Sequence, residues 1–120
     1  MSLPRPLRMT RRPQFEAVRL HGNSHGSRLL AVAWLAEDSA DPFQAGLIVP
    51  KALGRAVVRN RLKRQLSEIV RSAKKRMRSK QFVVTIARRG ALKASYRELE
   101  KEWHRLANRL NLLSPSLDTA

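Results

Sequence analysis

The chain has 120 residues, which is enough for one domain with one hydrophobic core. Its 25 Lys and Arg outnumber its 9 Asp and Glu, so the formal net charge is +16 and the protein is expected to bind a polyanion. Cysteine is absent, which excludes a disulfide framework, thiolate catalysis and cysteine-ligated zinc.

The apolar runs of the chain are too short for a membrane span. The longest of them, residues 29–36 and 46–50, fall far below the roughly 20 residues that a transmembrane helix needs. The N-terminus also lacks the hydrophobic region of a signal peptide. We therefore expect a cytoplasmic protein.

The N-terminal part of the chain predicts a basic tail, a short helix and a loop. Residues 1–9 are basic and rich in Pro, which favours a flexible or extended segment. Thr10 can cap a helix that carries Phe15 on its apolar face and ends near Gly22. Residues 21–26, with the sequence HGNSHG, are typical of a turn or loop.

Three apolar segments predict a sheet. Residues 28–36 and 44–50 are separated by an acidic loop that contains Pro, and together they predict two antiparallel strands. Residues 81–87, QFVVTIA, are a third β-rich run. Because a long helix lies between the second and third segments, we expect residues 44–50 and 81–87 to be parallel neighbours.

Two amphipathic helices complete a single predicted domain of residues 10–113. The first follows Gly54, and its apolar positions recur in one narrow stripe: Val58, Leu62, Leu66, Ile69 and Ala73. The second begins with a capping box of Ser95 and Glu98, and its apolar repeat continues to Leu113. Residues 114–120 are expected to form a frayed tail.

The outer face of the first long helix is strongly basic. The residues opposite or beside its apolar stripe are Arg61, Lys63, Arg64, Arg71, Lys74 and Lys75, together with Asn60 and Ser67, and only Glu68 interrupts them. Like charges repel along such a face, and the first turn lacks the acid that a helix N-terminus favours. A bound phosphate resolves both conflicts, because free backbone N–H groups and adjacent guanidinium groups bind its oxygens. The Asn60 side chain either hydrogen-bonds RNA or a neighbouring loop, or acts as a local cap.

Residues 46–70, GLIVPKALGRAVVRNRLKRQLSEIV, resemble the signature of the bacterial ribonuclease P protein subunit, and the resemblance extends over nearly the whole chain. The resemblance implies an α+β fold: a single-domain α-β sandwich of the ribosomal protein S5 domain 2-like type, ordered α-β-β-(β)-α-β-α with a βαβ crossover. It also implies that the protein binds a large RNA subunit, which carries out the Mg²⁺-dependent removal of the 5′ leader from precursor tRNA. The protein itself is then expected to supply no catalytic residue and no metal ligand.

The resemblance also suggests site residues by position. The residues that match the motif contacting the RNA subunit are Arg59, Asn60, Arg61, Lys63 and Arg64, and Lys51 close by is expected to bind RNA with them. In the family, a cleft between the first helix and the sheet receives the single-stranded leader, and Phe15 matches one of its aromatic positions. Arg28, Arg88 and Arg89 are expected to supply phosphate contacts near this cleft.

Several positions depart from the family pattern. Arg19 stands where many relatives have a second aromatic residue, and Ser67 replaces a frequent basic residue. On the first long strand Ala33 replaces an aromatic residue, and the neighbouring Trp34 is expected to point to the opposite face. Leader binding in this chain is therefore expected to depend more on charge than on stacking.

Catalysis by the protein alone has weak support in the sequence. His21 and His25 lie close together, but an ordinary polar turn explains them. The acids of residues 37–41 fit a solvated loop, and Glu100 with His104 supplies only two ligands, too few for a metal site.

Three binding functions compete with the leading hypothesis. A structural RNA-binding protein of the ribosomal type fits the composition equally well, and only the motif and the predicted cleft favour a ribonuclease P subunit. A DNA-binding module is disfavoured because no pair of short helices and no zinc ligands are found. Membrane-surface binding is disfavoured because the basic helix needs its apolar stripe for the core.

Overall fold

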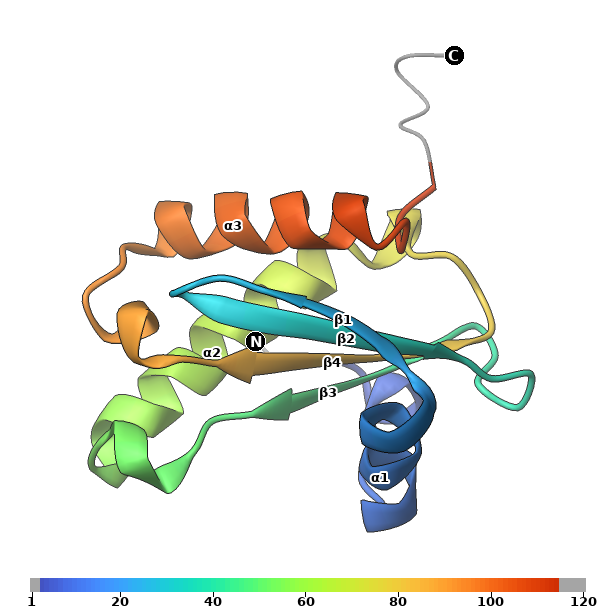
Figure 1. Cartoon of the computed structure of the whole chain (residues 1–120), viewed down its shortest axis with the longest axis horizontal. Helices are drawn as coiled ribbons and strands as arrows, with labels where there is room; N and C mark the ends of the chain where they lie inside the picture. Colours follow the sequence, from blue (N-terminus) through green and yellow to red (C-terminus); the bar gives the residue numbers. More distant parts are fainter. Residues whose placement is uncertain (1–2, 115–120) are drawn as a thin grey trace.

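A mixed sheet of four strands, in the order β1-β2-β4-β3, separates two layers of helices. The structure is a computed structural model that describes residues 3–114 (Figure 1). The longer elements are, in chain order, α1 (Arg12–His21), β1 (Asn23–Gly26), β2 (Leu30–Ala36), β3 (Gln44–Ile48), α2 (Ala56–Ser72), β4 (Gln81–Ala87) and α3 (Tyr96–Arg109). Short 3₁₀ turns connect them: η1 (Arg5–Leu7), η2 (Lys51–Leu53), η3 (Lys74–Arg76) and η4 (Arg89–Leu92). The predicted α+β order α-β-β-(β)-α-β-α is confirmed, with the optional third strand before the long helix present.

Strand β4 occupies the centre of the sheet, between β2 and β3. It pairs with β3 in parallel, with Gln44 opposite Phe82, as the strand-helix-strand order predicts. It also pairs with β2 in the antiparallel sense, with Leu30 opposite Ala87. The strands at residues 28–36 and 44–50 are therefore antiparallel in direction but are not neighbours. The reason is that β4 is apolar on both faces, and only a central position buries both.

The two faces of β4 lead into two separate parts of the core. Val83 and Ala87 pack with α2 and α3 on one face, while Phe82, Val84 and Ile86 pack toward α1 on the other. Figure 1 shows α3 along one face of the sheet and α1 below the opposite face. On the α3 side, the indole Nε1 of Trp103 donates a hydrogen bond of 2.9 Å to Thr85 Oγ1, and both side chains are fully buried.

The segment HGNSHG is not the predicted loop. Its residues Asn23–Gly26 form the edge strand β1, with Asn23 opposite Trp34 and Gly26 opposite Ala31. Turn-forming residues are tolerated because this strand is largely exposed and pairs on one side only. Pairing with β2 therefore overrides the local preference for a turn.

The amphipathic patterns of the long helices are confirmed. The predicted stripe is buried at Leu62, Leu66 and Ile69 of α2 and at its C-cap residue Ala73, and only Val58 at the start of the stripe is exposed. In α3 the capping box is present, because Ser95 N donates to Glu98 Oε1 at 2.8 Å and Glu98 N donates to Ser95 Oγ at 3.1 Å.

The start of α1 differs slightly from the prediction. The helix begins at Arg12 with Arg11 as its N-cap residue, one position after the predicted cap Thr10. The Oε1 atom of Gln14 accepts hydrogen bonds from the backbone N–H groups of Thr10 and Arg11, each at 3.0 Å. A side chain inside the first turn therefore takes over the capping role.

The segment before α1 is packed on the sheet, although the sequence predicts a flexible or extended tail. Leu3 and Met9 are buried, and Met9 N donates a hydrogen bond of 2.8 Å to Ala45 O on the edge strand β3. At the other end, Ser114 N donates to Arg76 O at 2.7 Å, and residues 115–120 of the predicted tail lie outside the described residues.

No helix within residues 3–114 is long and apolar enough to cross a membrane.

Candidate nucleic-acid interface

The start of α2 is fixed by a turn at Gly54. This residue has φ +145°, a conformation that costs other residues strain, and its N–H donates to Lys51 O at 3.2 Å. Its carbonyl oxygen accepts a hydrogen bond of 3.0 Å from Arg59 Nε. The backbone of Gly54 is thus hydrogen-bonded to both Lys51 and Arg59, which are two of the predicted RNA-contacting residues. The structure gives Arg59 a role in holding this turn, and RNA contact by its terminal guanidinium nitrogens stays a prediction.

The remaining motif residues form an exposed cationic surface. Arg61, Lys63 and Arg64 are exposed, whereas the intervening Leu62 is buried in the core. Within residues 3–114 none of the three cations forms an ion pair. Asn60 is exposed too, and its side chain makes no hydrogen bond with the described residues, which removes the local capping role left open by the sequence. The motif therefore faces outward as a group of unneutralised donors.

The second half of α2 is different, because its positive charge is partly neutralised. Arg71 Nε donates a hydrogen bond of 3.0 Å to Glu68 Oε1, and Arg71 Nη2 also contacts Glu68 Oε2. This hydrogen bonding lowers the pKa of Glu68. The basic face predicted over the whole helix is thus free of acids mainly along its first half, which contains the motif.

A cleft of about 310 Å³ lies between α1 and the sheet. Its residues come from α1, from the loop after it and from all four strands: Phe15, Glu16, Val18, Arg19, Gly22, Ser24, Ala33, Ile48, Val84 and Ile86. The ring of Phe15 lies directly over Gly46 of β3, where a Cβ atom would be only 2.5 Å from Phe15 Cε1. The absence of a side chain at Gly46 therefore allows the ring to approach the sheet and form one wall of the cleft.

The departures from the family pattern have structural consequences in this cleft. Ala33 lines it, while Trp34 packs on the opposite face of the sheet, as the alternation predicts. Arg19 also lines the cleft, but its Nη2 is 2.9 Å from Glu16 Oε2, and this hydrogen bond lowers the pKa of Glu16. The charge of Arg19 is therefore largely offset within the cleft, and the floor of the cleft is apolar.

The three arginines assigned to the leader do not line the cleft with Phe15. Arg28 and Arg89 line a separate hollow of about 520 Å³ together with Gly90, Leu92 and Lys93. Arg88 follows the cleft residue Ile86 by two positions, and its Nη1 donates a hydrogen bond of 3.0 Å to Ser27 O. The guanidinium group of Arg88 thus stabilises the turn between β1 and β2. RNA contact by Arg28, Arg88 and Arg89 stays a prediction.

The residues considered for catalysis are dispersed. His21 is the last residue of α1 and His25 lies in β1, while Asp41 lies 4.0 Å from Lys80 Nζ in the loop region before β3. No group of three His, Asp or Glu side chains that could hold a metal ion is found among residues 3–114. Burial lowers the pKa of His104 on α3, an effect that nearby Glu100 opposes and Arg76 reinforces.

Sequence reasoning missed the residues that build the floor of the cleft. Ile48, Ser24 and Ile86 carry no chemical signal by themselves, and β1 was not predicted. Alternation along β3 provides one usable signal, because Gln44, Gly46 and Ile48 share a face. The basic N-terminal segment was recognised as charged, but its packing against β3 was not.

Comparisons with known proteins show which family the sequence is similar to. A model of the family described as Ribonuclease P matches residues 3–111. The ribonuclease P protein component of Symbiobacterium thermophilum is 37% identical over 106 residues, which are 88% of this chain and 92% of the relative. That of Streptococcus pyogenes is 31% identical over 112 residues, which are 93% of this chain and 92% of the relative.

Solved structures share the fold. The ribonuclease P protein of Staphylococcus aureus superposes with a TM-score of 0.84 at 23% identity, covering 90% of this chain and 98% of that protein. The ribonuclease P protein of Thermotoga maritima superposes with a TM-score of 0.76 at 23% identity, covering 85% of this chain and 96% of that protein.

Proposed function

The chain belongs to the ribonuclease P protein family, and on this premise we propose that it binds the RNA subunit of ribonuclease P through the first half of α2 and the 5′ leader of precursor tRNA in the cleft beside α1. In this role it promotes removal of the leader during tRNA maturation in the cytoplasm. The reacting groups belong to the RNA subunit. Mg²⁺ is bound mainly by RNA phosphates, and we assign it no ligand in the protein.

The observation that carries the proposal is the unneutralised cationic start of α2. Arg61, Lys63 and Arg64 are exposed in the first half of α2 and form no ion pair with the described residues. The helix turn before them, where the macrodipole is positive, contains Arg59 and no acid. This arrangement is unfavourable for the isolated protein, and phosphates of a structured RNA make it favourable. Arg59 and Lys51 lie at the same helix start, connected through Gly54.

The cleft supports the second part of the proposal. Its wall contains an aromatic ring and its floor is apolar, so it can accept unpaired bases with little sequence preference. A base stacked on an aromatic side chain contributes about 1–3 kcal/mol to binding, as judged by alanine substitution. Binding of the single-stranded leader beside a separate site for the RNA subunit explains how the protein can distinguish precursor from mature tRNA.

The experiment compares cleavage of a labelled precursor tRNA at low Mg²⁺ by the protein alone, by a bacterial ribonuclease P RNA alone and by both together. We expect efficient cleavage at the mature 5′ end only in the combined reaction. If the RNA gains nothing from the protein while the protein still binds RNA tightly, the proposal is wrong and a purely structural RNA-binding role replaces it.

A further inference from the structure

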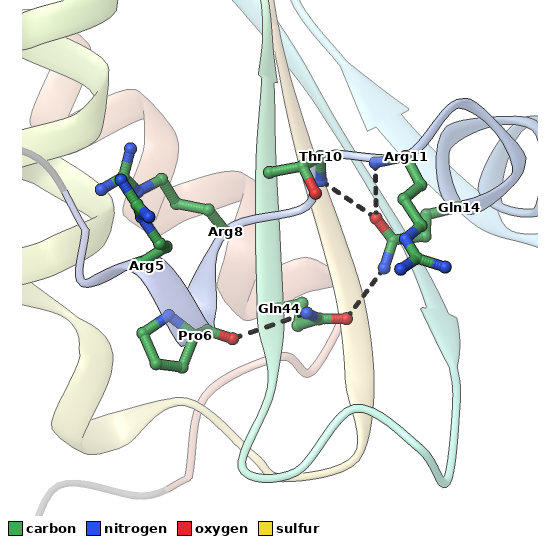
Figure 2. A pocket seen from close by; sticks show the side chains of 7 residues that line it. All are labelled: Arg5, Pro6, Arg8, Thr10, Arg11, Gln14 and Gln44. Atoms are coloured by element: carbon green, nitrogen blue, oxygen red, sulfur yellow. Dashed lines mark hydrogen bonds between the residues drawn. The ribbon is translucent and has the colours of Figure 1, made fainter.

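A second basic hollow, which the motif and the cleft do not include, lies beside the N-terminal segment. We call residues 3–11 the N-terminal strap. The hollow has a volume of about 640 Å³ and is lined by Arg5, Pro6, Arg8, Thr10, Arg11, Gln14 and Gln44 (Figure 2). It thus brings three arginines from the strap against the first turn of α1 and the first residue of β3.

The strap is held in place at several points, so the hollow is a built feature of the fold. Leu3 and Met9 are buried at its two ends, and Met9 N donates to Ala45 O at 2.8 Å. Between these anchors a chain of side-chain hydrogen bonds crosses from α1 to the strap. Gln14 Nε2 donates to Gln44 Oε1 at 3.1 Å, and Gln44 Nε2 donates to Pro6 O at 3.5 Å (Figure 2).

The arginines of the hollow are available for a ligand. Arg5, Arg8 and Arg11 are exposed, and none of them forms an ion pair within residues 3–114. In Figure 2 the guanidinium groups of Arg5 and Arg8 extend on the same side of Gln44, while Arg11 lies toward α1. The lining contains no acid and no aromatic ring, so the hollow is suited to phosphate oxygens and offers no aromatic ring on which a base can stack.

The hollow and the cleft both include residues of the same strand, β3. Gln44, Gly46 and Ile48 point to the same face of this strand. Gln44 lines the hollow, Gly46 lies beneath the ring of Phe15, and Ile48 lines the cleft. The distance along the strand from Gln44 to Ile48 is about 13 Å, from a rise of about 3.3 Å per residue. One extended strand of RNA can therefore pass from the cleft across Phe15 into the hollow.

The charge distribution favours this path. Within the cleft the one cation, Arg19, is paired with Glu16, so the cleft offers apolar and aromatic contacts but little net positive charge. The hollow has the complementary property: its three arginines form no ion pair with the described residues, and its lining contains no aromatic ring. We propose that the hollow binds the phosphates of the same single-stranded leader whose bases occupy the cleft, and that it extends the leader-binding site beyond Phe15. This inference rests on the proposed function.

The test measures the affinity of the reconstituted protein-RNA holoenzyme for precursor tRNAs whose leaders are lengthened one nucleotide at a time. The variant replaces Arg5, Arg8 and Arg11 with Ala. Its matched control removes three exposed cations from α3 on the opposite side of the sheet, by the substitutions Arg97→Ala, Lys101→Ala and Arg109→Ala. Thermal unfolding of each protein verifies the fold, and Arg→Gln substitutions at the same three strap positions replace the Ala set if the latter unfolds.

We expect the wild-type holoenzyme and the control to gain affinity with leader length in two stages, one for the cleft and one for the hollow. The strap variant should keep the first gain and lose the second, so that its affinity for precursor tRNAs with long leaders falls by about tenfold. Each phosphate contact on single-stranded RNA contributes about 0.7 to the magnitude of the log–log salt slope of binding. Loss of three contacts should therefore lower that magnitude by about 2 for the strap variant, and only with precursor tRNAs that have long leaders.

Three results would overturn the inference while leaving the proposed function intact. In the first, the strap variant matches wild type at every leader length. In the second, it loses the same affinity for short-leader, long-leader and mature tRNA, which would assign the hollow to the tRNA body. In the third, it binds the RNA subunit more weakly in the absence of tRNA, which would assign the hollow to that subunit. Failure of the proposed function is recognised separately, because the wild-type protein would then not stimulate cleavage at all.

Discussion

Replacement of Arg61 by Ala tests whether the start of α2 contacts RNA phosphate directly. Arg61 is exposed, lies in the helix half without acids, and forms no ion pair within residues 3–114. If its guanidinium group binds one phosphate, its loss removes about 0.7 to 0.9 from the magnitude of the log–log salt slope of binding. The double variant with Arg59→Ala should remove about twice as much, although Arg59 also donates to Gly54 O.

Arg71→Ala provides a matched control on the same helix. It removes the same formal charge, but Arg71 already forms an ion pair with Glu68. The assay is equilibrium binding of the isolated protein to a ribonuclease P RNA over a series of salt concentrations. We expect a smaller slope magnitude for Arg61→Ala and a wild-type slope for Arg71→Ala. Equal changes in the two variants would refute a direct contact and would indicate that only the net charge matters.

Four further predictions concern the cleft, the core and the pH dependence of stability. Phe15→Ala should reduce holoenzyme affinity for precursor tRNA by about 5- to 150-fold through lost stacking while sparing mature tRNA, and equal losses for both would remove Phe15 from the leader site. Gly46→Ala should produce the same selective loss in that binding assay, because the added Cβ displaces the Phe15 ring; unchanged leader affinity would contradict this. Thr85→Val should lower the free energy of unfolding in urea by about 1–3 kcal/mol, because it leaves the buried Trp103 N–H without its acceptor, and a neutral effect would argue against that hydrogen bond. Burial lowers the pKa of His104 below its ordinary 6.5, so the unfolded state binds a proton on this side chain more readily than the folded state does. The contribution of neutral His104 to the free energy of unfolding should therefore be complete above pH 6.5 and be lost as the pH decreases through the folded-state pKa. In urea titrations at several pH values, His104→Gln should flatten this dependence.

The cleft and the hollow illustrate why site prediction from sequence was incomplete. The sequence predicted that Phe15 lies on one helix and that the basic motif of residues 59–64 lies on another. Each prediction depends only on the spacing of residues within its own helix. The partners of Phe15 are Gly46 on β3 and residues of three other strands, which become neighbours only when the sheet forms. The family resemblance assigned Arg28, Arg88 and Arg89 to the leader cleft. The structure places Arg28 and Arg89 around a separate hollow.

What the sequence determined by itself is local: the apolar stripe of α2, the capping box of α3 and the basic motif between Gly54 and Glu68. These follow from interactions between residues three or four positions apart, which the chain specifies wherever the helix lies. The tertiary structure decided the central position of β4, the pairing of HGNSHG as an edge strand and the packing of the N-terminal strap on β3. Each of these depends on backbone hydrogen bonds and burial between segments far apart in the chain, and the local sequence does not encode which segment will provide the partner.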